Sequence, residues 1–304
     1  TLYCALRFIA GIGLAGELGA GITLVSESLP KELRAIGTSI VAGFGLLGAV
    51  VAKLTVGISG DWTTTYFIGG GLGLALLLLR IGVVESGIYK DIVSKIEVKK
   101  GNFISFFTNK DRFIRYIKCI AIGLPTWFCI GIFAFFGNQF AEPLGIKDVL
   151  DPGLCIMWAY VGISAGDFAS GFISHWLHSR KMAIFWMLVF TMIGVVLLVS
   201  GFATTANGYY FFMGWLGLGT GYWAMFVTLG AEQFGTNIRS TAATTIPNMV
   251  RGSLPLMVLL FDFLKPDTGI INAAIVVGVI AFGLAIYSAL TISETHNTDM
   301  DFVE

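Results

Sequence analysis

Glu17 is the only ionisable residue between Phe8 and Val25, a stretch that is long and apolar enough to cross the hydrocarbon core of a bilayer. An acid in the middle of such a segment costs about 2.5–3.5 kcal/mol on insertion scales, so it should face water, meet a partner or carry a proton. Alternate exposure to water on two sides would let this carboxyl group load and release a proton. Proton coupling is therefore one hypothesis for Glu17, beside a structural hydrogen bond and direct contact with a solute.

A second group of polar side chains lies on the segment 241–264. Thr244, Asn248 and Arg251 fall at helical spacing, so they share one face. A guanidinium group there could clamp a carboxylate or phosphate through two hydrogen bonds, which favours an anionic solute. Pairing of Arg251 with an acid on a neighbouring helix is the alternative. Four more residues are candidates for solute contact: Asn138, Gln139, Trp127 and Trp223. The two amides could equally cap a helix, and the two indoles could lie at a lipid interface.

The stretch from Gly11 to Gly16 reads G-x-G-x-x-G, the pattern of a dinucleotide-binding loop. Such a loop needs a strand before it and a turn at its glycines. The apolar run around this stretch instead predicts a continuous helix. We expect its glycines, and those of other small-x-x-x-small patterns such as Gly162 to Gly166 and Gly217 to Gly221, to let helix backbones pack closely.

No arrangement of residues typical of an enzyme is found in the predicted membrane segments. The four cysteines lack metal-ligand spacing, and His175 and His178, three residues apart, are interpreted as solvated rather than as metal ligands. We therefore expect no enzyme activity, no cofactor, no metal and no nucleic-acid partner.

The composition is that of an integral membrane protein. Of 304 residues, 56% are hydrophobic and only 12% are charged, and the mean hydropathy is +0.82; a soluble domain has about 25% charged residues. The apolar residues form separate long blocks, which predict helices rather than barrel strands. Nine spans are expected, at about 5–29, 35–58, 64–85, 114–138, 152–174, 181–204, 208–231, 241–264 and 269–293.

Charge predicts the orientation of these spans. Lys and Arg gather in alternate loops on one side, above all in the long connection after Glu85, and by the positive-inside rule that side is cytoplasmic. The connection and the C-terminal tail would then be cytoplasmic. Lys53 lies near the outer end of its span, where its side chain is expected to extend to the interface.

An internal repeat divides the chain. The loops 27–34 and 232–239 share the pattern E-x-apolar-[P/G]-x-x-apolar-R, and each joins two predicted spans. Two similar halves follow, with six spans in the second and three in the first. The predicted division is a partial N-terminal bundle of three transmembrane helices (1–88), a cytoplasmic linker (89–112) and a C-terminal six-helix bundle with a short cytoplasmic tail (113–304).

These motifs resemble those of the major facilitator superfamily. Arg7, followed by Gly11 and Gly13, is similar to the motif of the family's fourth helix, and the stretch 166–181 is similar to the motif between helices eight and nine. The loops 27–34 and 232–239 resemble the paired signatures of the sugar-porter and metabolite:proton symporter branches. The prolines expected at the span ends of sugar porters are replaced by Val84 and Ser293, which disfavours a sugar as the substrate.

The resemblance covers essentially the whole chain and implies helices four to twelve of a twelve-helix, all-α bundle, so three helices would be missing before Thr1. It implies a proton-transfer or cavity role for Arg7, with anchoring at the outer membrane face as the alternative. The charged residues of the paired loops and of the stretch 166–181 are interpreted as a cytoplasmic gate: Glu27, Arg34, Glu85, Asp167, Arg180, Glu232, Arg239 and Glu294.

The predicted function is secondary active transport of a small polar solute by alternating access. Proton-coupled symport is expected, with an anionic solute favoured if Arg251 acts as a clamp. The alternatives are an efflux antiporter and a non-transporting membrane sensor of the same fold. The expected partners are a small-molecule solute, protons and the lipid bilayer, for a multi-pass monomer in the plasma (inner) membrane.

Overall fold

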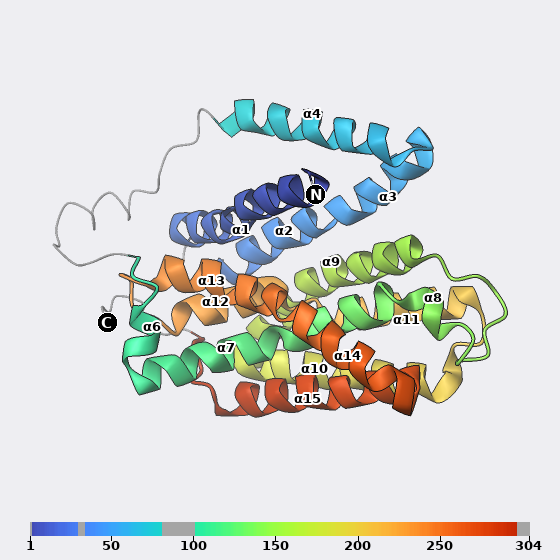
Figure 1. Ribbon diagram of the computed structural model, residues 1–304. Coiled ribbons are helices and arrows are strands. Elements are labelled where there is room, and N and C mark those ends of the chain that lie inside the picture. Colours follow the sequence, from blue (N-terminus) through green and yellow to red (C-terminus); the bar gives the residue numbers. More distant parts are fainter. Residues whose placement is uncertain (1, 30–33, 81–100, 297–304) are drawn as a thin grey trace.

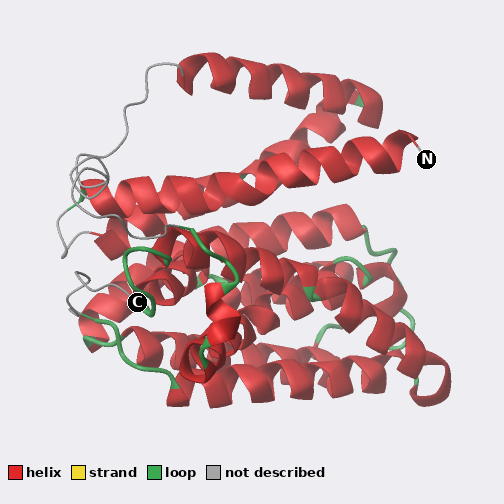
Figure 2. Cartoon of the chain, turned by 60° about the vertical axis from the view of Figure 1, so that its left-hand side comes forward, coloured by secondary structure: helices red, strands yellow, loops and turns green. Residues whose placement is uncertain are grey.

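The computed structural model describes residues 2–29, 34–80 and 101–296 (Figure 1). Within these ranges, side chains are described except those at positions 15–20, 22, 23, 26–28, 34–36, 39 and 80. The described residues form helices and connecting loops, with no strand among them (Figure 2). The predicted all-α fold is confirmed.

Four helices precede the linker: α1 (Leu2–Ser28), α2 (Arg34–Leu46), α3 (Gly48–Ser59) and α4 (Trp62–Arg80). After the linker come the short α6 (Ser105–Thr108) and then α7 (Lys110–Phe128), η1 (Cys129–Ala134), α8 (Gly137–Phe140), α9 (Pro152–Leu177), α10 (Arg180–Leu197), η2 (Leu198–Phe202), α11 (Ala206–Thr220), α12 (Trp223–Glu232), α13 (Arg239–Gly252), α14 (Leu254–Thr268) and α15 (Ile270–Thr291). Below, α1–α4 are called the N-terminal half and α7–α15 the C-terminal half.

Seven helical segments of the described chain are long and apolar enough to cross a membrane. They lie at Ile40–Ser59, Trp62–Leu79, Lys110–Ala134, Pro152–Leu177, Arg180–Phe202, Arg239–Thr268 and Ile270–Thr291. The expected segment 208–231 is interrupted between α11 and α12, and only part of α1 has described side chains. The count of nine spans and the division into domains therefore stay predictions.

The stretch that reads G-x-G-x-x-G lies within the continuous helix α1, from Leu2 to Ser28. No turn separates its glycines, so the helix expected from the apolar run is confirmed and a dinucleotide loop is excluded there.

Close backbone contact between α9 and α11 depends on the predicted glycines. A Cβ atom added at Gly217 would overlap the backbone of Ala159, and one added at Gly166 would overlap the backbone of Leu218. By contrast, Gly69 and Gly73 of α4 have open space where a Cβ would lie. The small-residue pattern thus packs helices in the C-terminal half but does not do so within the described surroundings of α4.

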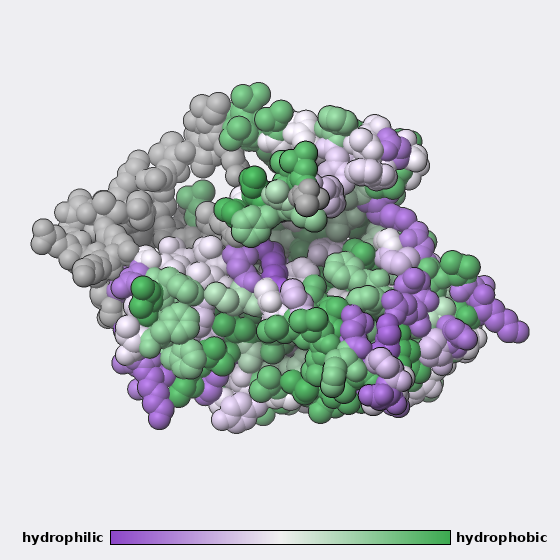
Figure 3. All heavy atoms as spheres, in the orientation of Figure 1, coloured by the Kyte–Doolittle hydropathy of each residue, from purple (hydrophilic) through white to green (hydrophobic). Residues whose placement is uncertain are grey.

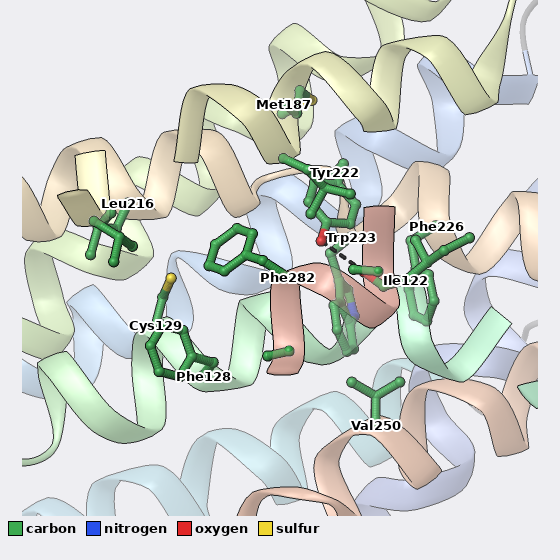
Figure 4. Packing of buried hydrophobic residues seen from close by; sticks show 14 of the residues in the cluster. Ile122, Phe128, Cys129, Met187, Leu216, Tyr222, Trp223, Phe226, Val250 and Phe282 are labelled. Atoms are coloured by element: carbon green, nitrogen blue, oxygen red, sulfur yellow. Dashed lines mark hydrogen bonds between the residues drawn. The ribbon is translucent and has the colours of Figure 1, made fainter. Parts of the chain in front are cut away.

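Aromatic and aliphatic side chains fill the core of the C-terminal half. Tyr222, from the connection between α11 and α12, is buried there and donates a hydrogen bond to the Ile122 backbone oxygen at 2.9 Å (Figure 4). Phe128 and Phe282 pack edge to face, with ring centroids 6.1 Å apart. The first contact holds the break between α11 and α12 against α7, and the second packs α15 on α7.

The two halves pack together through a few helices. α2 and α3 pack on α9, α1 packs on α13, and α2 also contacts α12. Ser164 of α9 donates a hydrogen bond to the Gly43 backbone oxygen of α2 at 2.7 Å, and Phe168 packs edge to face on Phe44. α4 contacts α3 and lies farther from the C-terminal half (Figure 1).

We call the end of the bundle where α7 begins and α15 finishes the linker end. Lys118, about two turns into α7, donates a hydrogen bond to the Thr291 backbone oxygen at 3.1 Å, so the last residue of α15 lies beside the first half of α7. The opposite end, where α9 begins, is called the far end.

Candidate functional site

Arg251 lies on α13 and is partly buried. Its guanidinium group lies over the Trp223 ring of α12, 5.7 Å from the ring centroid, and its Nη1 donates to the Asn248 Oδ1 at 3.4 Å. Tyr160 of α9 lies close enough to interact electrostatically with it. No described carboxylate forms an ion pair with Arg251. The predicted pairing with an acid of a neighbouring helix is therefore not found among the described residues.

Trp127 of α7 adds a hydrogen-bond donor to the same region. Its ring packs edge to face against Trp223, with centroids 6.4 Å apart. The Trp127 Nε1 is buried and has no hydrogen-bond partner among the described residues. A buried N–H without an acceptor costs about 1–3 kcal/mol, so a ligand that supplies one is favoured at this position.

Asn248 connects this region to Thr244. The Asn248 Nδ2 donates to the Thr244 backbone oxygen one turn earlier at 2.8 Å, so the amide is oriented along α13. The structure thus brings together five of the seven predicted solute contacts: Thr244, Asn248, Arg251, Trp127 and Trp223. Their role in solute binding stays a prediction.

Asn138 and Gln139 lie elsewhere. Both are exposed on the short helix α8, and the Gln139 Oε1 accepts a hydrogen bond from Lys265 Nζ at 2.9 Å. Lys265 follows Arg251 by about 20 Å of helix. The structure therefore does not bring these two amides to the Arg251 region.

The predicted proton-coupling residues are on α1. Arg7 is exposed and has no ion pair with a described residue. The side chain of Glu17 lies outside the described ones. α1 packs against α13, so the helix that carries Glu17 adjoins the helix that carries Arg251.

Charged residues of the predicted gate meet at the linker end. Arg180 of α10 and Glu232 of α12 form an ion pair at 2.5 Å in which both side chains are 7% exposed. Burial raises the pKa of Glu232 above its ordinary value, and the charges of Arg180 and of Arg239, at the start of α13, oppose this shift without cancelling it. Because α10, α12 and α13 all belong to the C-terminal half, this network lies within one half of the structure.

Glu294 completes the network just after α15. Its carboxylate accepts hydrogen bonds from the Ser179 hydroxyl and from the Arg180 backbone N–H at 3.0 Å, at the N-terminus of α10. Burial alone would raise the pKa of Glu294, but the hydrogen bonds from Ser179, His296 and Arg180 outweigh it and lower the pKa below its ordinary value. An anion at a helix N-terminus also satisfies backbone donors that the helix leaves free.

Asp167 takes no part in this network. It is fully buried in α9, and its Oδ1 accepts a hydrogen bond from the Ala224 backbone N–H at 3.0 Å, in the first turn of α12. The sequence placed Asp167 in the gate because its motif leads into Arg180. In the structure more than three helical turns separate the two, so the carboxyl group lies inside the bundle.

The remaining gate candidates, Glu27, Arg34 and Glu85, have side chains outside the described residues.

The two histidines expected to be solvated, His175 and His178, lie at the linker end next to His296. The rings of His175, His178 and His296 follow one another at centroid distances of 6.2 and 5.9 Å. No group of three or more His, Cys, Asp or Glu residues that could hold a metal occurs in the part of the chain that the structure describes.

An ion pair that the sequence analysis missed lies at the far end. Lys53 Nζ of α3 lies 2.6 Å from Asp151 Oδ2, at the start of α9, so it joins the two halves. Its side chain was expected to extend toward the membrane interface instead. The sequence did contain a signal for the partner, because an Asp before Pro152 is typical of a helix N-cap, and Asp151 accepts from the Gly153 N–H at 2.7 Å.

Comparison with known proteins agrees with this architecture. The family model of the Major Facilitator Superfamily matches residues 1–255. The chain is 25% identical over 266 residues to a putative niacin/nicotinamide transporter of Bacillus subtilis. This alignment covers 81% of the chain and 61% of that protein. It is 24% identical over 181 residues to a sialic acid transporter of Escherichia coli, covering 58% of this chain and 43% of that protein.

A niacin transporter of Acinetobacter baylyi is 35% identical over 89 residues, or 28% of this chain and 20% of that protein. The chain thus spans about three fifths or less of the length of these relatives. All three are named as transporters and none as an enzyme, in agreement with the expected absence of enzyme activity. The chain is an integral membrane protein, and it belongs to the Major Facilitator Superfamily.

Proposed function

We propose that the chain is part of a secondary transporter that carries a small, carboxylate-bearing solute together with protons by alternating access. The plasma (inner) membrane is its proposed location, with the linker end cytoplasmic, since Arg180, Lys181 and Arg239 lie at that end. We propose a monomer as the working unit.

The observation that carries the proposal is the environment of Arg251. A buried charge is costly unless it is paired, and this guanidinium has an aromatic face and one amide oxygen beside it but no described carboxylate. An anionic ligand would supply the missing charge through two parallel hydrogen bonds, which suits the planar geometry of Arg. In the space-filling view, hydrophilic side chains gather in a hollow between the N-terminal helices and the C-terminal half, within a largely apolar surface (Figure 3).

The indole rings favour a flat or ring-shaped solute. Trp127 and Trp223 meet edge to face beside the guanidinium, and the Trp127 N–H is free to donate. Niacin and sialic acid, which name two of the relatives, both carry a carboxylate group on a ring. This shared chemistry supports the proposed solute class but does not select between the two compounds.

Glu17 is the proposed proton carrier, with Arg7 as its proposed partner in proton transfer. The basis is the position of an acid in an otherwise apolar helix. The contact between α1 and α13 would let proton binding on α1 influence the solute region.

A binding experiment with a matched ligand pair tests the solute site. Nicotinate and nicotinamide share one ring, but only nicotinate carries a negative charge. Measuring the affinity of the purified protein that contains this chain for both ligands therefore distinguishes an ionic contact with Arg251 from stacking on the indole rings. Arg251→Ala should weaken nicotinate binding by about 1.5–3 kcal/mol, roughly 10- to 150-fold, because a hydrogen bond to a charged group is lost. Nicotinamide binding should change little.

Lys265→Ala serves as the control, because Lys265 is a cation on the neighbouring helix α14 that binds Gln139 instead. If Arg251→Ala weakened the binding of both ligands equally, the proposed clamp would be refuted. It would also be refuted if the variant bound nicotinate and every other carboxylate tested as tightly as the native protein does. In proteoliposomes, Glu17→Gln should abolish uptake driven by a pH gradient while leaving solute exchange intact. Unchanged gradient-driven accumulation would exclude the proton role of Glu17.

A further inference from the structure

Asp167 occupies an unusual position at the interruption between α11 and α12. Both its carboxylate oxygens are buried, and only one of them has a partner: Oδ1 accepts from the Ala224 N–H at 3.0 Å. The Oδ2 atom has no hydrogen-bond partner in the described chain. A buried, ionised oxygen without a donor is costly, and a proton on that oxygen removes the charge.

The helix break brings this carboxyl group to a set of free backbone donors. α12 starts at Trp223 without a side-chain cap from Tyr222, and the Gly221 backbone touches Gly166, the residue before Asp167. The close approach of these two glycines allows an acid on α9 to reach the N-terminus of α12. The partial positive charge of a helix N-terminus favours the ionised acid, whereas burial with a free oxygen favours the neutral acid.

None of the described charged side chains competes for Asp167. None of the described ionisable side chains on α9, or on the elements packed against it, forms an ion pair or hydrogen bond with Asp167. These side chains are Lys53, Cys129, Asp151, Cys155, Tyr160, His175, Arg180, Lys181, Tyr209, Tyr210, Tyr222 and Glu232. Lys53 is bonded to Asp151, and Arg180 is bonded to Glu232. The side chain of Arg34 on α2 lies outside the described ones.

We propose that Asp167 is a proton-binding site of the C-terminal half, at which the proton sits on Oδ2 while Oδ1 keeps its bond to α12. Release of the proton to water, when the bundle opens, leaves a carboxylate that binds the N-terminus of α12 more strongly. Proton binding at Asp167 is thereby linked to the position of α12, which carries Trp223. The role in solute coupling rests on the proposed transport function, but the proton binding itself does not.

Infrared difference spectroscopy between acidic and alkaline pH measures this directly on the purified protein. With 13C-labelled aspartate, the carbonyl stretch of a protonated Asp side chain shifts relative to Glu, so signals from Glu17 are told apart. We expect a titrating band from a buried protonated Asp in the native protein. Asp167→Asn should lose the whole band, since the amide keeps an oxygen for the Ala224 N–H but takes up no proton.

Asp111→Asn is the control, because Asp111 is an aspartate of the same half that lies exposed in the first turn of α7. It should keep the buried band. If Asp167→Asn does not fold, Asp167→Glu retains a carboxyl group, and the band should then lose its isotope shift. A native protein without a titrating Asp band, or a band that persists in Asp167→Asn, would overturn the proposal. Neither outcome depends on transport, so failure here is distinct from failure of the solute site.

Discussion

Replacement of Arg180 by methionine should lower the free energy of unfolding by about 3–5 kcal/mol, because it leaves Glu232 buried without its ion-pair partner. Both side chains are 7% exposed, so water cannot take the place of the guanidinium. The contacts of Glu294 should persist, since that carboxylate binds the Arg180 backbone N–H rather than its side chain. The folded-to-unfolded ratio should fall by roughly two to four orders of magnitude.

The double replacement Arg180→Met with Glu232→Met should restore most of this loss. Desolvation of the two charges offsets much of their attraction, so apolar residues of similar volume often do as well. A double-mutant cycle, measured by denaturation in mixed micelles, would report a large coupling energy.

Lys181→Met is the matched control for this cycle. Lys181 is the next residue of α10, is partly exposed and forms no ion pair with a described residue, so its replacement should change stability by no more than about 0.5 kcal/mol. If the double variant were as unstable as Arg180→Met, or if Arg180→Met cost no more than Lys181→Met, the buried pair would not be the source of the stability.

Two further predictions concern the far end and the glycine contact. The hydrogen bond from Lys53 lowers the pKa of Asp151, so the pair stabilises the fold above the unfolded Asp pKa and its contribution is lost as pH falls. Lys53→Met should therefore lower the free energy of unfolding by at most about 1 kcal/mol at neutral pH, as expected for a partly exposed ion pair. On acidification the melting temperature of the variant should approach that of the native protein. A difference in melting temperature that does not change with pH would contradict this. Gly217→Ala should destabilise the protein by about 1–3 kcal/mol, because the added Cβ would overlap the backbone of Ala159. Gly69→Ala should be neutral or slightly stabilising, because open space surrounds the added Cβ. Equal melting temperatures for the two variants would refute the packing argument.

The candidate solute site was partly predictable from the sequence. Thr244, Asn248 and Arg251 were grouped correctly, because helical periodicity alone places such residues on one face. Trp127 and Trp223 come from other helices, and their position beside Arg251 is a property of the packing of α7 and α12 on α13. Periodicity along one helix cannot report which neighbouring helix faces it.

The charged residues show the same limit. The sequence grouped Arg180, Glu232 and Glu294 at one end of the bundle, and their contact follows from the ends of α10, α12 and α15 lying together. It also grouped Asp167 with them, and it missed the bond from Lys53 to Asp151. In both cases the partner lies far away in the chain, so no local pattern identifies it.

The sequence by itself determined that this chain lies in a membrane as a set of helices. A bilayer offers no water to backbone groups, so apolar segments of sufficient length must satisfy their own hydrogen bonds, and composition with periodicity is enough to predict that. Only the tertiary structure decided which polar side chains lack a partner. Among the described residues, the Trp127 N–H and one Asp167 oxygen have no hydrogen-bond partner, and Arg251 has no carboxylate beside it. These features depend on what the neighbouring helices bring within a few ångströms, and therefore on how the helices pack rather than on any one of them.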